Sequence, residues 1–97
     1  MISSFGSTIK RLRESKHLLQ RQVANELSID SPMLSKIERG DRKAKREQVL
    51  VFAKLYNANR EELLSLWLAE QVMDTIKGED LAQQAIDLVS QRIKKSR

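Results

Sequence analysis

Apolar side chains recur three and four positions apart along nearly the whole chain, and this spacing predicts an all-helical protein. Only three glycines and one proline interrupt the pattern, and strand-forming residues are sparse. The periodicity and its breaks predict six helices, at about 5–16, 20–27, 31–39, 47–57, 60–77 and 79–94. A chain of 97 residues has room for one modest core, so we expect a single all-α unit.

Residues with known preferences for helix ends mark several of these boundaries. Asp30 is a suitable N-cap for the third helix, Pro32 is tolerated in its first turn, and Gly40 is placed to end it. Asn59 and Glu62 resemble a capping box at the start of the fifth helix. Other candidate boundary residues are Ser3 or Ser4 before the first helix and Gly78 after the fifth.

Composition excludes several classes of protein. The chain has no cysteine, and therefore neither a disulfide framework nor a thiolate metal site. No apolar run approaches the roughly 20 residues of a membrane span, and the N-terminus lacks a signal-peptide pattern, so we expect a cytoplasmic protein that does not enter the membrane. His17 is the only histidine, and no glycine-rich phosphate loop occurs. We expect no enzyme activity, no cofactor and no metal.

The net charge of +5 is unevenly distributed. Residues 1–46 carry eleven basic and five acidic side chains, whereas residues 47–97 carry seven basic and eight acidic ones. A basic N-terminal half beside a nearly neutral C-terminal half indicates a surface that faces a polyanion. Charge alone does not distinguish such a protein from many other helical proteins.

The third predicted helix has two different faces. At 100° per residue, Leu34 and Ile37 fall on one side, while Pro32, Lys36 and Arg39 fall on the other. A helix that enters the major groove of DNA needs small residues for close approach and basic residues that reach base edges or phosphates. From periodicity alone, an ordinary surface helix is the favoured explanation of this pattern.

Three segments favour a DNA-binding helix over an ordinary surface helix. They are residues 9–13 (IKRLR), residues 34–40 (LSKIERG) and residues 53–58 (AKLYNA). With residues 20–40 as a whole, they closely resemble the Cro/repressor (XRE) family of helix-turn-helix proteins. The resemblance covers about residues 5–64. It implies a lambda-repressor-like bundle of five helices, here followed by a sixth, in which residues 1–66 bind double-stranded DNA and residues 67–97 form an extension.

The resemblance also assigns roles to single residues. It places base or phosphate contacts on the second helix, on the outer face of the third and on the loop that follows. The implied DNA-contacting residues are Gln20, Arg21, Ser31, Pro32, Met33, Ser35, Lys36, Arg39, Arg42 and Lys43. It further implies a structural ion pair between Arg13 and Glu38, which joins the first and third helices.

Two positions depart from the family pattern. Ser28 stands at a turn position where the family usually has glycine, so a positive φ there would strain the serine. Leu19 replaces the usual Thr or Ser N-cap of the second helix, so no side-chain cap is expected there.

The fifth and sixth helices carry more apolar surface than one buried stripe requires. The two alternatives are packing within the chain and a homodimer, and the family usually dimerises because one recognition helix covers only a half-site. We favour a twofold dimer. Its expected interface residues are Leu64, Trp67, Leu68, Val72, Ile76, Ile86 and Val89.

These features favour a sequence-specific transcription regulator, and the chain's size resembles controller proteins of restriction–modification systems and Cro-like phage repressors. An antitoxin that represses its own operon and binds a protein toxin is the alternative. A module that binds only protein is less consistent with the basic side chains of Lys36, Arg39 and Arg42.

Overall fold

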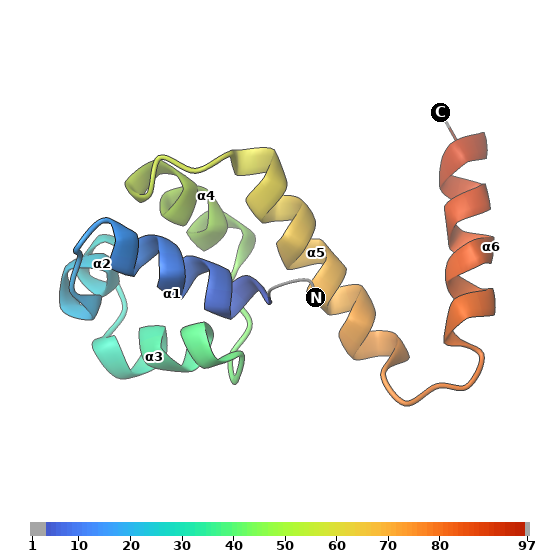
Figure 1. The fold of residues 1–97 in the computed structure, drawn as a ribbon, viewed down its shortest axis with the longest axis horizontal. Coiled ribbons are helices and arrows are strands. Elements are labelled where there is room, and N and C mark those ends of the chain that lie inside the picture. The colour runs from blue at the N-terminus through green and yellow to red at the C-terminus, as the bar shows by residue number, and fades with distance from the viewer. Residues whose placement is uncertain (1–3, 97) are drawn as a thin grey trace.

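The computed structural model describes residues 4–96 and shows helices and no strand within that range. The helices are α1 (Phe5–Ser15), α2 (Gln20–Glu26), α3 (Ser31–Arg39), α4 (Arg46–Leu55), α5 (Arg60–Ile76) and α6 (Ala82–Lys95). Figure 1 shows α1 to α5 gathered into one body and α6 standing apart from it. The prediction of an all-α protein with six helices is confirmed.

Side-chain caps and glycines explain most of the helix boundaries. Ser4, Asp30 and Asn59 each accept a hydrogen bond from the backbone N–H three residues later, at 3.1, 2.8 and 2.9 Å. Gly40 and Gly78 follow α3 and α5 with φ angles of 83° and 78°, a conformation that glycine adopts without steric strain. The alternative first cap, Ser3, lies outside the described residues.

Two predicted boundaries were wrong by two residues or more. α4 ends at Leu55 and not at 57, because Asn57 has a φ of 50° and the N–H of Ala58 donates back to the carbonyl of Ala53 at 2.9 Å. α6 begins at Ala82 and not at 79. Residues 77–81 reverse the chain direction, and the periodicity does not show how many residues such a turn consumes.

The core lies between α1, α2, α3, α4 and the first half of α5. Its largest fully buried side chains are Ile9, Val23, Leu34, Val49, Phe52 and Tyr56. Phe52 meets Phe5 edge-on and stacks with Tyr56, with ring centroids 6.2 and 5.8 Å apart. The hydroxyl of Tyr56 is buried without a hydrogen-bond partner among residues 4–96, and this burial raises the pKa of the phenol.

α1 is held against two other helices at its N-terminal end. A methyl group on Gly6 would lie 2.7 Å from the carbonyl oxygen of Ile37 and closer still to that of Glu38, so only glycine permits this approach of α1 to α3. The backbone N–H of Phe5 donates to Glu70 Oε1 at 2.6 Å, which ties the start of α1 to α5. Sequence periodicity predicts neither contact.

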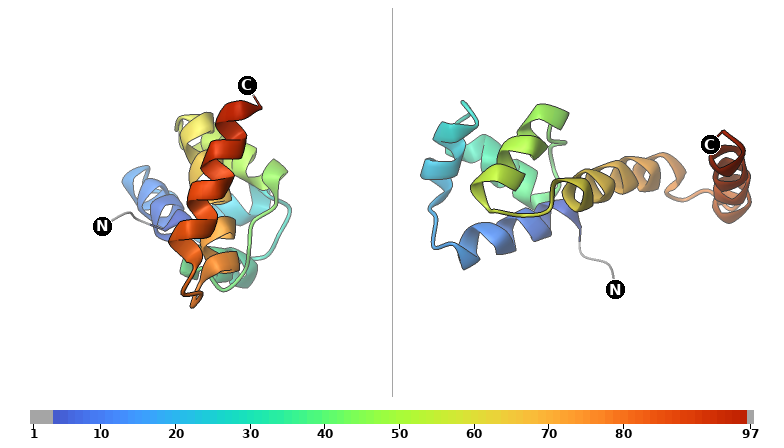
Figure 2. Two further views of the ribbon diagram at one scale, coloured as in Figure 1. Left: turned by 90° about the vertical axis from the view of Figure 1, so that its right-hand side faces the viewer. Right: turned by 90° about the horizontal axis from the view of Figure 1, so that it is seen from above.

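α6 projects from the body on the end of α5, as the right-hand view of Figure 2 shows. The radius of gyration is 15.2 Å, above the roughly 13 Å expected for a compact chain of this length. None of the α6 residues, all of which are described, is buried. Among residues 4–96, no helix combines the length and the apolar character needed to cross a membrane.

Candidate nucleic-acid interface

Four residues, 27–30, connect α2 to α3. Ser28 has a φ of 58°, and the N–H of Ile29 donates to the carbonyl of Ala24 at 3.0 Å. The Ile29 side chain is partly buried and packs against the core, which anchors the turn there. Ser28 is thus in the left-handed conformation that the sequence analysis considered, at a cost of about 1 kcal/mol.

α3 buries one face and presents the other. Leu34, Ile37 and Glu38 are buried, with exposed fractions of 0%, 3% and 5%. The predicted DNA-contacting residues of this helix lie outside that stripe: Pro32, Lys36 and Arg39 are exposed, and Ser31, Met33 and Ser35 are half-buried. Met33 also packs against the core, so only part of its side chain is available to a ligand.

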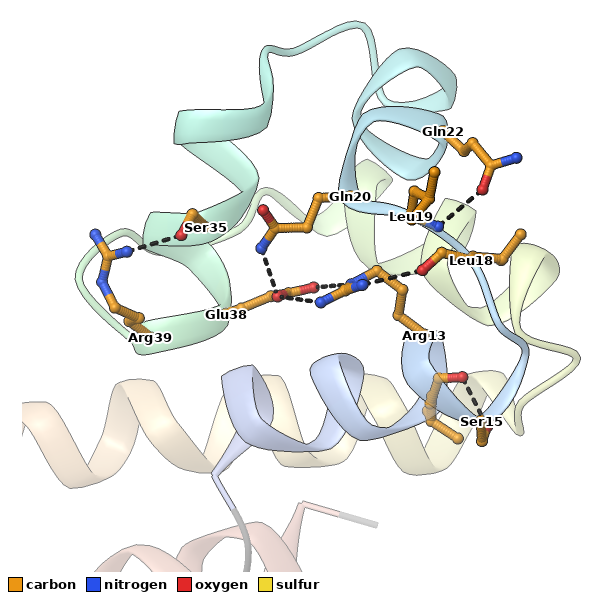
Figure 3. A network of polar contacts seen from close by, with 10 residues as sticks. Arg13, Ser15, Leu18, Leu19, Gln20, Gln22, Ser35, Glu38 and Arg39 are labelled. Carbon is orange, nitrogen blue, oxygen red and sulfur yellow. Dashed lines mark hydrogen bonds and ion pairs between the residues drawn. The ribbon is translucent and has the colours of Figure 1, made fainter.

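Arg13 and Glu38 form a bidentate pair between α1 and α3 (Figure 3). Arg13 Nε donates to Glu38 Oε2 at 2.7 Å, and Nη2 donates to Oε1 at 3.2 Å. A third guanidinium nitrogen donates to the carbonyl of Leu18 at 3.0 Å. The side chains are 11% and 2% exposed, and the hydrogen bond that Arg13 donates to Glu38 raises the pKa of Arg13. The pair is therefore shielded from water and orients α3 on α1.

Gln20 is the first residue of α2 and joins this network from the outside. Its Nε2 donates to Glu38 Oε1 at 2.9 Å. Because a carboxylate only accepts hydrogen bonds, the amide must turn its nitrogen toward Glu38 and its carbonyl oxygen away. Figure 3 shows that oxygen on the side of Gln20 opposite to Glu38. The geometry thus links a predicted DNA-contacting residue to the buried ion pair, a link that sequence spacing does not show.

Leu19 has no side-chain cap, as the sequence predicts. The carboxamide of Gln22 replaces part of that function, since its Oε1 accepts a hydrogen bond from the N–H of Leu19 at 2.8 Å.

Lys36 and Arg39 differ in the hydrogen bonds and ion pairs that their side chains form within the protein. Arg39 Nη1 donates to Ser35 Oγ at 2.7 Å, and its Nε lies 3.1 Å from Asp41 Oδ2. Both members of the Arg39–Asp41 pair are more than half exposed, so the pair contributes little to stability. Within residues 4–96, the Lys36 side chain has no hydrogen bond or ion pair, and the residue is exposed.

The basic loop, defined as residues 41–45, follows α3 and is anchored to α5. Trp67 Nε1 donates to the carbonyl of Ala44 at 2.7 Å, and the guanidinium of Arg46 lies 5.5 Å from the centre of the tryptophan ring. Lys43 Nζ approaches Gln71 Oε1 at 3.4 Å. Arg42 and Lys43 are exposed on this loop. Residues of α5 therefore set the position of the loop that the sequence analysis assigned to phosphate contacts.

The predicted dimer residues occupy two different environments. Leu64 and Trp67 are partly buried against the body of their own chain. Ile76 and Ile86 are half-buried, whereas Leu68, Val72 and Val89 are 46%, 45% and 50% exposed. In the described part of the chain, no three His, Asp or Glu side chains are grouped as a metal site would require.

Comparison with known proteins matches residues 4–66, well over half of the chain, to the family described as a helix-turn-helix domain. The chain belongs to this helix-turn-helix family. It is accordingly a DNA-binding regulator, with α2 and α3 as the two helices of the motif. No curated protein and no solved structure matches the chain.

Proposed function

We propose that this helix-turn-helix protein binds a (pseudo)palindromic operator as a homodimer and regulates transcription from it. The observation that carries the proposal is the exposed outer face of α3, on which the ammonium of Lys36 is free while the opposite face is fixed by the core and by Glu38. A rigid helix with a free basic side chain suits direct contact with base edges in the major groove.

Phosphate contacts fall to the flanking residues in this proposal. Arg21 on α2 and Arg42 and Lys43 on the basic loop are exposed, so they can follow the DNA backbone on either side of α3. Such contacts position the protein without reading sequence, whereas Lys36 supplies a base contact. Residues 1–66 would then bind DNA, and residues 67–97 would hold two copies together.

Lys36→Ala is the direct test, with Lys54→Ala on the exposed side of α4 as the matched control. Binding is measured by fluorescence anisotropy on an operator selected from random DNA and on a scrambled duplex. We expect Lys36→Ala to weaken operator binding by about 1–3 kcal/mol and scrambled binding much less. Equal losses on both duplexes would assign Lys36 to phosphate.

The basic loop is tested by the salt dependence of the same binding. Arg42→Ala and Lys43→Ala should each lower the slope of log K against log salt by about one unit. A slope that stays at the wild-type value would remove those side chains from the interface.

The identity of the regulated operon is part of the proposal, and a restriction–modification operon fits a regulator of this size. The alternative is an antitoxin, which the exposed apolar side chains of α5 and α6 favour because a toxin could cover them. Neighbouring genes for a methyltransferase or for a toxin would separate the two. Co-purification of a small protein at a fixed ratio would favour the antitoxin.

A further inference from the structure

The side-chain amide of Gln20 is held at one end by a rigid acceptor. Its Nε2 donates to Glu38 Oε1 at 2.9 Å. The Glu38 side chain is 2% exposed and accepts two hydrogen bonds from Arg13, at 2.7 and 3.2 Å. Because a carboxylate only accepts hydrogen bonds, Glu38 determines which end of the Gln20 amide faces inward.

The outer end of the amide keeps one acceptor and one donor. Gln20 Oε1 accepts no hydrogen bond within residues 4–96. The only buried side-chain oxygen or nitrogen without a partner in that range is the Tyr56 hydroxyl, so the Gln20 oxygen is accessible to solvent. Nε2 carries two hydrogens, of which Glu38 takes one. Gln20 therefore presents a carbonyl oxygen and one N–H in an orientation that Glu38 has set.

The Gln20 amide borders the exposed face of α3. Ser31, Ser35 and Glu38 are separated by four and three residues, so they share one side of this helix. Both serines are half-buried, and Lys36 is exposed on the adjacent side. Bound to Glu38, the amide lies between α2 and α3 along this edge (Figure 3). When α3 enters the major groove as proposed, the amide enters beside it.

The major-groove edge of adenine matches the free groups of this amide. Adenine offers the N6 amino group as a donor beside N7 as an acceptor, so the Gln20 oxygen can accept from N6 while its free N–H donates to N7. Guanine presents two acceptors, O6 and N7, which would oppose the carbonyl oxygen, and cytosine presents a donor alone. A phosphate also presents only acceptors. A glutamine that can turn its amide would serve these groups better than Gln20 does.

We propose that Gln20 reads an adenine in the half-site and that Glu38 is the positioning residue that sets this preference. The inference rests on the proposed function, because it needs α3 in the major groove. It adds the base that is recognised and a second residue, besides Lys36, that reads sequence. The orientation of the amide belongs to the free protein and is measured without DNA.

Binding-site selection from random DNA, with the full chain and with Gln20→Ala, identifies the base. We expect the wild type to require an adenine in the half-site at a position where the variant accepts any base. Asn25→Ala, which removes an exposed amide without hydrogen bonds in the described residues from the same helix, is the control and should keep the wild-type preference. A Gln20→Ala variant that binds more weakly with unchanged base preferences would overturn the proposal.

Base analogues test the two bonds separately. Replacing the selected adenine by purine removes the N6 amino group, and replacing it by 7-deazaadenine removes the N7 acceptor. Each analogue should weaken wild-type binding about fivefold more than it weakens the binding of Gln20→Ala. The comparison cancels any effect of the analogue on the duplex itself. Equal losses in the two proteins would overturn the adenine contact.

Glu38→Gln tests the positioning role. The new amide keeps an acceptor for Arg13 and can either donate to Gln20 or accept from it, so the Gln20 amide is no longer held in one orientation. The ratio of affinities for adenine and guanine at the selected position should fall from about tenfold toward one. A merely structural loss would lower both affinities and leave the ratio unchanged, which would overturn the role of Glu38.

Nuclear magnetic resonance of the full chain without DNA tests the orientation directly and does not depend on the folding of Glu38→Gln. Of the two Nε2 protons of Gln20, one should exchange with solvent more slowly than the other, because it is bonded to a buried carboxylate. The side-chain amide of Asn25 should show no such difference. Two Gln20 protons that exchange equally fast would overturn the fixed amide.

The outcomes separate this inference from the proposed function. A protein that prefers no duplex over a scrambled one would overturn the proposed function and the adenine contact, while unequal proton exchange would still show an oriented amide. A protein that selects an operator but whose adenine preferences are the same in Gln20→Ala would overturn the inference alone.

Discussion

The five-helix body and α6 use the same helical periodicity with different results. In α3, Leu34 and Ile37 are 0% and 3% exposed, whereas Val89 and Ile93, which share one face of α6, remain about half exposed. A helical repeat predicts that a helix forms and which of its faces is apolar. What covers that face depends on elements far away in the sequence, or on another chain.

Polar contacts differ between the two regions in the same way. In the body they join distant segments, as Glu38 does with Arg13 and Gln20. The side-chain hydrogen bonds of α6 are local, such as that from Gln83 to Asp87 at 2.9 Å. Substitutions in the body should therefore change folding stability, whereas substitutions on α6 should change association.

Glu38→Ala should have the largest effect on the body. It leaves the guanidinium of Arg13 partly buried without its anion, and we expect the free energy of unfolding to fall by about 3–5 kcal/mol. Urea unfolding followed by circular dichroism measures this loss. Asp41→Ala, which breaks the exposed pair with Arg39, is the control and should change stability by less than about 0.5 kcal/mol. Similar values for the two variants would contradict the distinction between body and surface.

Gly6→Ala should come next. Its added methyl group meets the carbonyl oxygens of Ile37 and Glu38, so α1 and α3 must separate, and we expect a loss of about 1–3 kcal/mol. Lys10→Ala on the exposed side of α1 is the control and should leave the melting temperature nearly unchanged. A stable Gly6→Ala variant would mean that the two helices are less tightly packed than the structure shows.

Glu38 and Gly6 also show which features of the fold the sequence predicts and which it does not. The helices, most caps and the faces of α3 follow from periodicity and from residues such as Asp30 and Gly40. The exclusion of side chains at Gly6 and the bond from Trp67 to Ala44 do not, because each depends on how helices distant in sequence cross. Sequence spacing likewise predicts that Gln20 begins α2. It does not predict that the side-chain amide of Gln20 is oriented by its hydrogen bond to Glu38.

Trp67→Phe should have a smaller effect that extends from the body to the interface. Phenylalanine keeps most of the packing and loses the bond to the Ala44 carbonyl, which lowers stability by about 1 kcal/mol. Because the basic loop is then less fixed, operator affinity and the salt slope should fall together. Ser65→Ala, two residues before Trp67 on the exposed face of α5, is the control and should change neither operator affinity nor the salt slope.

Deleting residues 79–97 should change the body even less. α6 has no buried residue, so the free energy of unfolding at low protein concentration should stay within about 1 kcal/mol of the full chain. At high concentration the full chain should gain stability from dimer formation, and the shortened chain should not. A shortened chain that is unfolded at all concentrations would show that α6 belongs to the folding unit.

Tyr56→Phe should have the smallest effect at neutral pH. It removes the one buried side-chain polar atom that has no hydrogen-bond partner among the described residues. The Tyr56 hydroxyl is buried without a partner in residues 4–96, so removing it should leave stability unchanged or raise it by up to about 1 kcal/mol. Burial raises the pKa of the folded phenol above its ordinary value of 10.0. Above that pH the unfolded chain loses the proton while the folded one keeps it, so wild-type stability falls as pH rises.

The difference between the two proteins should therefore be near zero at pH 7 and grow in favour of phenylalanine above pH 10. Thermal unfolding of both proteins between pH 7 and 11 measures it, and the comparison cancels the titration of every other group. A loss of more than about 1 kcal/mol in Tyr56→Phe at pH 7 would mean that the hydroxyl has a bonding partner in solution.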